Sequence, residues 1–268
     1  MDPQKTPLPA LPRRVVLKLG TRILTRPDGV GLDLKNLQAI VAAVVGLANR
    51  GVELLVVSSG AVGAGLFSYG KKTRPEDLAA LQALAAVGQS RLMHHYEQAF
   101  RQHDCRVGQL LLTYHDLDSP ERRQRILATL EALLTLGKTI PVINENDSVA
   151  TEELSFGDND LLSSRVAELV QADLLVLFTS VEGLHAPGAE GDPLVESVPD
   201  VTRVLHYARQ HDDPLSRGGM QSKLKAVEAA TRVGIPVVMA HGRHPEQLPA
   251  LLAGQGRGTR FSARRTPS

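Results

Sequence analysis

The sequence contains no tryptophan, a single cysteine and few aromatic residues. Aromatic residues make up 3% of the 268 residues, so we expect no platform on which nucleic-acid bases could stack. Cys105 alone can form neither an intrachain disulfide nor a cysteine-based zinc site. This usage is typical of a reducing cytoplasm, where a lone cysteine is usually a small buried hydrophobe rather than a nucleophile.

Excess charge and long apolar runs are also absent. The 30 Lys and Arg residues are matched by 29 Asp and Glu residues, and the net charge of +1 disfavours a large basic surface for nucleic acids. The longest apolar run, residues 39–48, is about half the roughly 20 residues of a membrane-spanning helix. The first residues hold several prolines but no apolar centre of a signal peptide. We therefore expect no contact with a membrane and a cytoplasmic location.

Apolar residues recur in a pattern that alternates short strands with helices. Apolar and β-branched runs predict strands at residues 15–19, 53–58, 107–113, 139–143, 174–179 and 235–240. Helical spacing and end signals predict helices at residues 34–47, 76–103, 120–137, 160–171 and 219–233. This alternation indicates an α/β fold whose mainly parallel sheet is covered on both faces. We expect a flexible arm at residues 1–12, one domain at 13–262 and a basic tail at 263–268.

The informative side chains lie where predicted strands end, which is the edge at which parallel α/β sheets bind ligands. Lys18 lies near the end of the first strand, and a buried lysine there is costly unless an anion meets it. Gly20 would let the backbone approach that anion closely. A tight turn with an exposed lysine explains these residues equally well. Residues 58–65 add two hydroxyls and three glycines, which form an anion cradle or let a helix pack closely on a strand.

Three further polar segments have two readings each. Residues 144–147 suit a ligand with ammonium and carboxylate groups, Asp147 facing the ammonium, although an Asx turn favours the same residues. Residues 157–160 precede a helix, where capping accounts for only one of the two acids. Metal binding is the other reading, although the spacing is not that of an EF-hand. Residues 217–223 place two glycines before a helix and Lys223 one turn later, which indicates a phosphate clamp or a capped helix with an exposed lysine.

Two lysines, glycine-rich segments and acids at strand ends together indicate phosphoryl transfer. Residues 65–72 approach the P-loop pattern, but Lys72 stands where the Mg²⁺-binding hydroxyl belongs and no strand directly precedes them, so we reject that reading.

Seven longer stretches are more specific, and they span nearly the whole interval from Val15 to about Phe261. They are VVLKLGTRILT (15–25), VVSSGAVGAG (56–65), AAVGQSRLMHHYEQAF (85–100), GQLLLT (108–113), IPVINENDSVAT (140–151), FGDNDLLS (156–163) and GGMQSKLKAVEAATRVGIPVVMA (218–240). In this order they resemble the glutamate 5-kinases, a group within the amino acid kinase family. The segments AVGQSRLM and INENDSVAT are typical of that group.

The resemblance implies a three-layer αβα sandwich with a central, mainly parallel sheet. It implies transfer of the ATP γ-phosphoryl group to the side-chain carboxylate of L-glutamate, which gives γ-glutamyl phosphate in the first step of proline biosynthesis. Mg²⁺ is expected with the nucleotide, with no residue assigned as a direct metal ligand. The further partners that the resemblance suggests are proline as a feedback inhibitor, a glutamyl phosphate reductase that takes the product, and further copies of the chain in a homo-oligomer.

The resemblance also implies roles for individual residues. Lys18 and Lys223 match the lysines that touch the transferring phosphoryl group, and Asp158 matches the acid that orients them. The residues that match glutamate-binding positions are Ser59, Asn144, Asp147 and Asn159. The residues that match nucleotide-binding positions are Lys18, Gly20, Gly60, Thr179, Ser180, Arg217, Gly218, Gly219, Met220, Gln221, Ser222 and Lys223.

The sequence departs from the family pattern at two positions and in length. Ser180 replaces an aspartate that the family often has, and Leu161 replaces an asparagine. Many relatives carry a C-terminal PUA domain, and we expect a short form without one. Two alternative functions stay open: another carboxylate kinase of this fold, with acetylglutamate kinase the nearest, and a non-catalytic protein that senses glutamate or proline.

Overall fold

The computed structural model describes residues 11–26, 31–71, 73–149, 159–187, 192–210 and 219–264. Its strands are β1 (Arg14–Leu19), β2 (Glu53–Ser58), β3 (Arg106–Leu112), β4 (Thr139–Glu145), β5 (Leu174–Thr179), β6 (Ser197–Val198), β7 (Val237–His241) and β8 (Thr259–Phe261). Its α-helices are α1 (Thr21–Leu24), α2 (Leu34–Ala48), α3 (Ala61–Ser68), α4 (Leu78–Arg101), α5 (Tyr114–Asp118), α6 (Pro120–Thr135), α7 (Asn159–Leu169), α8 (Met220–Arg232) and α9 (Leu248–Leu252). Two 3₁₀ helices span Val201–Gln210 and Pro245–Gln247.

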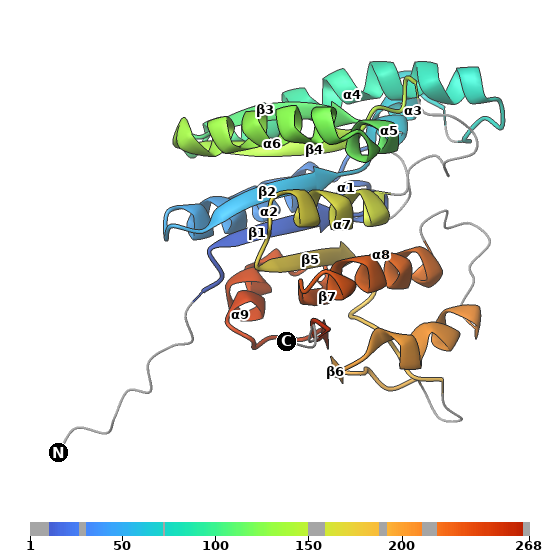
Figure 1. Ribbon diagram of the computed structural model, residues 1–268. Helices are drawn as coiled ribbons and strands as arrows, with labels where there is room; N and C mark the ends of the chain where they lie inside the picture. Colours follow the sequence, from blue (N-terminus) through green and yellow to red (C-terminus); the bar gives the residue numbers. More distant parts are fainter. Residues whose placement is uncertain are drawn as a thin grey trace.

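The strands form a single sheet in the order β3-β4-β2-β1-β5-β7-β8-β6. The pairs from β3 to β7 are parallel, whereas β8 runs antiparallel to β7 and β6 runs parallel to β8. The carboxyl ends of the parallel strands therefore lie along one edge of the sheet (Figure 1). The predicted α/β class with a mainly parallel sheet is confirmed, and the six predicted strands correspond to β1 to β5 and β7.

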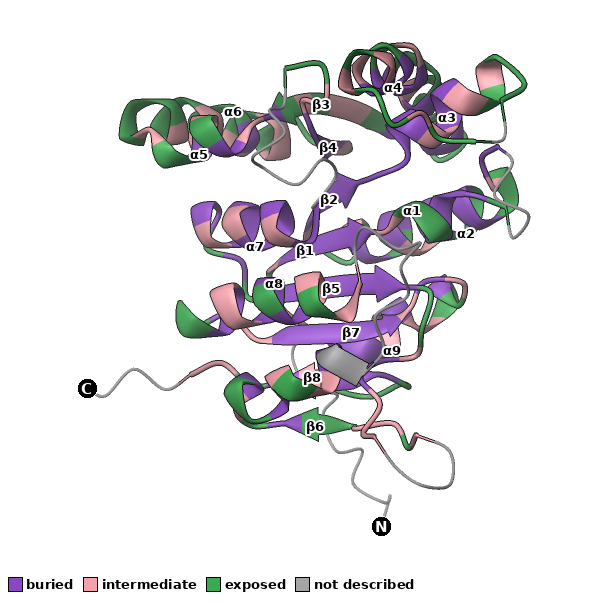
Figure 2. Cartoon of the chain, turned by 90° about the vertical axis from the view of Figure 1, so that its right-hand side faces the viewer, coloured by how far each residue is buried: buried purple, intermediate pink, exposed green. Residues whose placement is uncertain are grey.

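Helices cover both faces of the sheet because its strands are apolar on both sides. Along β1, Val15, Leu17 and Leu19 belong to one buried cluster with residues of α2, α4 and α9, whereas Val16 belongs to a second cluster with residues of α6, α7 and α8. Figure 1 shows these two helical layers on either side of the strands, and Figure 2 shows the buried central strands between helices with exposed outer faces. The expected three-layer αβα architecture is thus confirmed.

The long helices begin where the sequence places capping residues. The side chain of Asp33 accepts a hydrogen bond from Asn36 N at the start of α2, and that of Asp77 accepts one from Ala80 N at the start of α4. Ser119 caps α6, and Pro120 is its first helical residue. These local signals account for helix starts within two residues of those predicted from the sequence.

Helices α3 and α4 approach each other through two glycines. A Cβ atom on Gly88 would lie 1.8 Å from the carbonyl oxygen of Ala61, and one on Gly65 would lie 2.0 Å from that of Leu84. Gly60, the N-cap of α3, has a φ of 106° that L-residues rarely adopt. The glycine-rich segment therefore lets α3 pack closely against α4, a helix rather than a strand. Gly60 also allows the backbone conformation at the start of α3.

The ends of the chain are described in part. The backbone N–H of Arg264 donates to the Thr231 carbonyl, so the chain stays in contact with α8 up to that residue. Residues 1–10 and 265–268 lie outside the described ranges, and the domain boundaries stay predictions. Among the helices that the structure describes, none combines the length and apolar character needed to cross a membrane.

Candidate active site

Lys18 is buried by the alternation of side chains along β1. Its neighbours Leu17 and Leu19 face α2 and α4, so Lys18 shares the opposite face with Val16, toward α7 and α8. Lys18 is only 5% exposed. This excludes the alternative of an exposed lysine in an ordinary turn.

A carboxylate from α7 meets both of the predicted phosphoryl-binding lysines. Asp160, the second residue of α7, accepts a hydrogen bond from the Lys18 ammonium through Oδ1. Its Oδ2 lies 3.3 Å from Lys223 Nζ and 3.3 Å from the Ser222 hydroxyl. The fold thus brings together two lysines from distant parts of the sequence on one acid.

The electrostatics of this cluster favour an anionic ligand. Burial penalises the Asp160 carboxylate, but the charges and hydrogen bonds of Lys18 and Lys223 hold its pKa below the ordinary range. The side chains are 1% exposed for Asp160, 7% for Lys18 and 15% for Lys223. Two ammonium groups against one carboxylate give these three side chains a net positive charge, which favours an anionic ligand.

The first turn of α8 adds a second feature that attracts anions. Gly219 is the N-cap of α8, and Met220, Gln221 and Ser222 form the turn that leads to Lys223. The positive end of the helix dipole therefore lies beside the Lys223 ammonium. Because the Lys223 side chain is largely buried, the alternative of an exposed lysine on a capped helix is excluded. Arg217 and Gly218 lie outside the described residues.

Hydrogen-bonded amide side chains extend from this cluster across the sheet edge. Asn159 precedes Asp160 in α7, and its Nδ2 donates to Ser59 Oγ at 3.0 Å and to Asn144 Oδ1 at 3.1 Å. Asn144 Nδ2 in turn donates to Gln89 Oε1 of α4 at 2.7 Å. All four residues are buried. Three of the four predicted glutamate-binding residues therefore lie in one network beside Asp160.

Asp147, the fourth of these residues, follows β4 and lies in a turn closed by a hydrogen bond from Val149 N to the Asn146 carbonyl. Residues 146–149 thus form a backbone turn, which does not test the predicted Asx turn at residues 144–147, and Asn144 still belongs to β4. Burial raises the pKa of the Asp147 carboxyl to about 6, partly offset by the charge of Arg74. A carboxylate destabilised by burial gains from a cationic partner, such as a substrate ammonium.

The remaining predicted nucleotide-binding residues surround the carboxyl ends of β1, β2 and β5. The Gly20 N–H donates to the Phe178 carbonyl at 3.3 Å, so this donor is already engaged. The Thr179 hydroxyl is turned back onto its own loop, where it accepts from Val181 N at 3.0 Å. Ser180 is exposed beside it. Contacts of these residues and of Gly60 with a nucleotide stay predictions.

Two residues of the site were not assigned from the sequence. Asp158 lies outside the described residues, and the acid that the structure places between the lysines is Asp160. The feature of the sequence that could have identified Asp160 is a second acid at the start of the predicted helix, which helix capping does not explain. The second residue is Gln89. The feature of the sequence that could have identified it is that a polar residue interrupts the buried face formed by Ala85, Gly88 and Leu92 on α4.

The acids of the site that the structure describes do not form a metal centre by themselves. Within the described ranges, no group of three or more His, Cys, Asp or Glu side chains could hold an ion. Both carboxylate oxygens of Asp160 already accept hydrogen bonds from lysines. A divalent cation at this site would therefore depend on ligand oxygens and water, as Mg²⁺ bound to phosphates commonly does.

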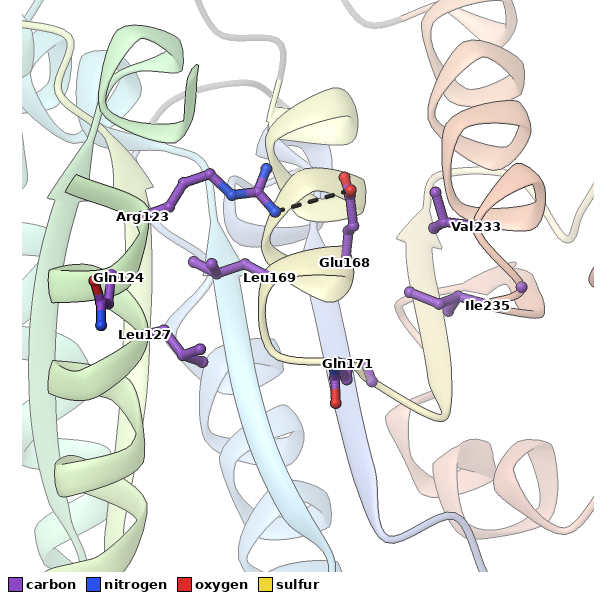
Figure 3. Close-up of a pocket in the computed structure, with 10 residues that line it drawn as sticks. Arg123, Gln124, Leu127, Glu168, Leu169, Gln171, Val233 and Ile235 are labelled. Carbon is purple, nitrogen blue, oxygen red and sulfur yellow. Dashed lines mark ion pairs between the residues drawn. The ribbon is translucent and has the colours of Figure 1, made fainter. Parts of the chain in front are cut away.

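A separate hollow of about 640 Å³ lies on the face covered by α6, α7 and α8 (Figure 3). Its walls include the turns after α7 and α8, which lead into the amino ends of β5 and β7, opposite the edge that carries Lys18. Leu127, Leu169 and Ile235 make it partly apolar, and Arg123 and Glu168 form an ion pair at 3.8 Å across it. It contains none of the predicted site residues.

Sequence comparison supports the assignment that the site suggests. The profile of the Amino acid kinase family matches residues 13–241. A glutamate 5-kinase of Thermus thermophilus is 46% identical over 256 residues, which cover 94% of this chain and 68% of that protein. The glutamate 5-kinase of Symbiobacterium thermophilum is 44% identical over 256 residues, which cover 93% of this chain and 96% of that protein.

Solved structures share the fold at low sequence identity. Carbamate kinase from Giardia lamblia bound to AMP-PNP superposes with a TM-score of 0.66 and 16% identity over 94% of this chain and 99% of that chain. UMP kinase from Bacillus anthracis gives a TM-score of 0.64 and 15% identity over 96% and 98% of the two chains. With the profile match and the curated relatives, the conclusion is that the chain belongs to the amino acid kinase family and, within it, to the glutamate 5-kinases.

Proposed function

We propose that this chain transfers the γ-phosphoryl group of ATP to the side-chain carboxylate of L-glutamate, the first step of proline biosynthesis. The observation that carries the proposal is the buried cluster of Lys18, Asp160 and Lys223, with its surplus positive charge, beside a network of amide side chains. The cluster suits a polyphosphate, and the network with Asp147 suits an amino acid. The names of the curated relatives supply the identity of that amino acid.

The chemistry asks little of the protein beyond charge and position. A glutamate side-chain carboxylate is already ionised and nucleophilic at pH 7, so no general base is required. The obstacle is the repulsion between two anions, and Lys18 and Lys223 offset it on the transferring group. Asp160 holds both ammonium groups in place, so their geometry is set before the ligands bind.

We propose that Mg²⁺ enters with the nucleotide rather than at a preformed protein site. Since both oxygens of Asp160 are engaged by lysines, phosphate oxygens and water are its expected ligands. When bound, the ion neutralises charge on the phosphate groups.

The order of the strands in the sheet indicates how the substrate would be oriented. The reacting carboxylate belongs near Lys18 on β1, and the α-ammonium near Asp147, which follows β4 two strands away. A free ammonium also favours glutamate over N-acetylglutamate, because acetylation removes the charge that Asp147 would meet.

The proposal is tested by ATP turnover with L-glutamate, L-aspartate and N-acetylglutamate, with hydroxylamine present to trap the acyl phosphate as a hydroxamate. We expect ADP and hydroxamate with L-glutamate, and far less with the other two acids. Preference for N-acetylglutamate would identify an acetylglutamate kinase instead. Thermal stabilisation by glutamate without any ADP formation would identify a sensor.

The other expectations from the sequence and from the resemblance stay predictions. They are inhibition by proline, transfer of the product to a glutamyl phosphate reductase, assembly into a homo-oligomer and a cytoplasmic location. The same turnover assay, run with and without proline, tests the first of them.

A further inference from the structure

One backbone group fixes the orientation of the amide side chains that lead from the site to α4. The Glu145 N–H can only donate, so the Asn144 atom that it meets at 2.9 Å is Oδ1. Asn144 Nδ2 must then be the donor to Gln89, and the Gln89 atom at 2.7 Å must be Oε1. The remaining polar atom of Gln89 is therefore Nε2, which can only donate.

This donor has no acceptor within the described part of the chain. Gln89 is 9% exposed, and its Nε2 is buried without a hydrogen-bond partner among the described residues. Native proteins rarely leave a buried donor unmatched, because the loss of hydration is not recovered. Asn159 Oδ1 is the other unmatched atom of the network, and it belongs to the glutamate site proposed above. An unmatched donor on the same network indicates a further contact with the ligand.

The position of Gln89 indicates which part of the ligand it meets. Strand β4, where Asn144 lies, is separated from β1 and Lys18 by β2. Adjacent strands lie about 4.8 Å apart, so the Gln89 end of the network is roughly 10 Å across the sheet from the reacting end. Asp147 follows the same strand β4. A substrate whose side-chain carboxylate lies near Lys18 would thus place its α-carbon substituents toward Gln89 and Asp147.

We propose that Gln89 is a specificity-determining residue whose Nε2–H donates to the α-carboxylate of the substrate amino acid, while its Oε1 holds Asn144 in place. This inference rests on the proposed function, since it takes glutamate as the ligand. The two charged groups on the α-carbon would then be bound separately. Gln89 would bind the carboxylate, and Asp147 would bind the ammonium.

Two substitutions separate donation to the ligand from support of Asn144. Gln89→Glu keeps an oxygen that accepts from Asn144 Nδ2 but replaces the donor with a negative charge. Gln89→Ala removes both functions. Gln98→Glu, at an exposed position of the same helix, is the matched control. Each variant is compared with the unchanged protein in glutamate binding by calorimetry and in steady-state turnover.

The decisive comparison uses ligands that lack one group of glutamate. 4-Aminobutyrate lacks the α-carboxylate, and glutarate lacks the ammonium; each is measured as a substrate or as a competitive inhibitor. We expect both Gln89 variants to weaken glutamate and glutarate binding about 10- to 100-fold, which is the effect of losing one hydrogen bond to a charged group. Binding of 4-aminobutyrate to Gln89→Glu, which keeps the support of Asn144, should change less than threefold, and KM for ATP should not change.

The opposite results would overturn the inference. Unaltered glutamate binding in Gln89→Glu would show that Gln89 only supports Asn144. An equal loss for glutamate and 4-aminobutyrate in Gln89→Glu would show that Nε2 does not contact the α-carboxylate. Failure of the unchanged protein to produce hydroxamate from glutamate would refute the proposed kinase activity, while the calorimetric comparison would still decide the role of Gln89.

Discussion

Replacing Asp160 with asparagine removes the carboxylate that separates two buried ammonium groups. The Asp160 side chain is 1% exposed, and its partners Lys18 and Lys223 are 7% and 15% exposed. Removing one partner of a buried ion pair costs about 3–5 kcal/mol, because the remaining charge stays buried without compensation. We expect Asp160→Asn to lower the free energy of unfolding by this amount in urea titrations followed by circular dichroism.

The matched control is Asp118→Asn. Asp118 pairs with Arg165 between α5 and α7, but its side chain is 61% exposed, so the loss should stay below about 1 kcal/mol. Pyrophosphate should stabilise Asp160→Asn more than the unchanged protein, since the variant carries one further positive charge at the site. An equal loss of stability in the two variants would refute the view that Asp160 compensates buried charge.

The same substitution has a pH dependence with a definite sign. The pKa of Asp160 is lowered in the folded protein, so its contribution to stability is fully present above the ordinary aspartate pKa of about 3.9. That contribution is lost as the pH falls through the lower folded pKa. The stability gap between the unchanged protein and Asp160→Asn should therefore be constant from pH 5 to pH 8 and close only in stronger acid.

Three further predictions concern the lysines, Asp147 and the glycine contact. Lys18→Met and Lys223→Met should each lower kcat roughly 10²–10³-fold, and losses below tenfold for both in steady-state kinetics would contradict their roles. Because the pKa of Asp147 is about 6 and only the ionised form pairs with an ammonium, kcat/KM for glutamate should fall about tenfold per pH unit below pH 6. Asp147→Asn should raise KM for glutamate and abolish this pH dependence. If the pH dependence persists in Asp147→Asn, Asp147 is not its origin. Gly88→Ala forces a Cβ to within 1.8 Å of the Ala61 carbonyl and should cost about 1–3 kcal/mol in urea unfolding. Gly46→Ala, in open space on α2, should instead stabilise by about 0.5–1 kcal/mol, and equal effects of the two alanines would refute the packing argument.

The sequence was sufficient to predict the central sheet and the long helices. Continuous apolar runs mark buried parallel strands, and Asp33, Asp77 and Ser119 cap helices through contacts within three residues. Strands β6 and β8 contain only two and three residues, which is too short for a periodic signal. Their pairing depends on the return of the chain beside β7, so it could not be derived locally.

For the site, the sequence predicted the lysines better than the acid between them. Lys18 lies near the end of a strand and Lys223 follows a glycine pair, and both patterns are local. The segment contains two acids two positions apart, Asp158 and Asp160. Asp158, the predicted one, lies outside the described residues, and the contacts of Asp160 with both lysines depend on where α7 begins, at Asn159. The contact of Gln89 with Asn144 depends on the packing of α4 beside β4, and no local pattern of the sequence predicts that packing.

The groups of the site come from six segments, those that hold Lys18, Ser59, Gln89, Asn144, Asp160 and Lys223. They meet only because strands β1, β2 and β4 and helices α4, α7 and α8 assemble in one arrangement. No contiguous half of the chain contains both Lys18 and Lys223 together with Asp160. Activity should therefore require the whole folded domain. A proteolytic fragment that lacks either Lys18 or Lys223 should have no turnover. During refolding, activity should return only when the segments that hold these two lysines have come together.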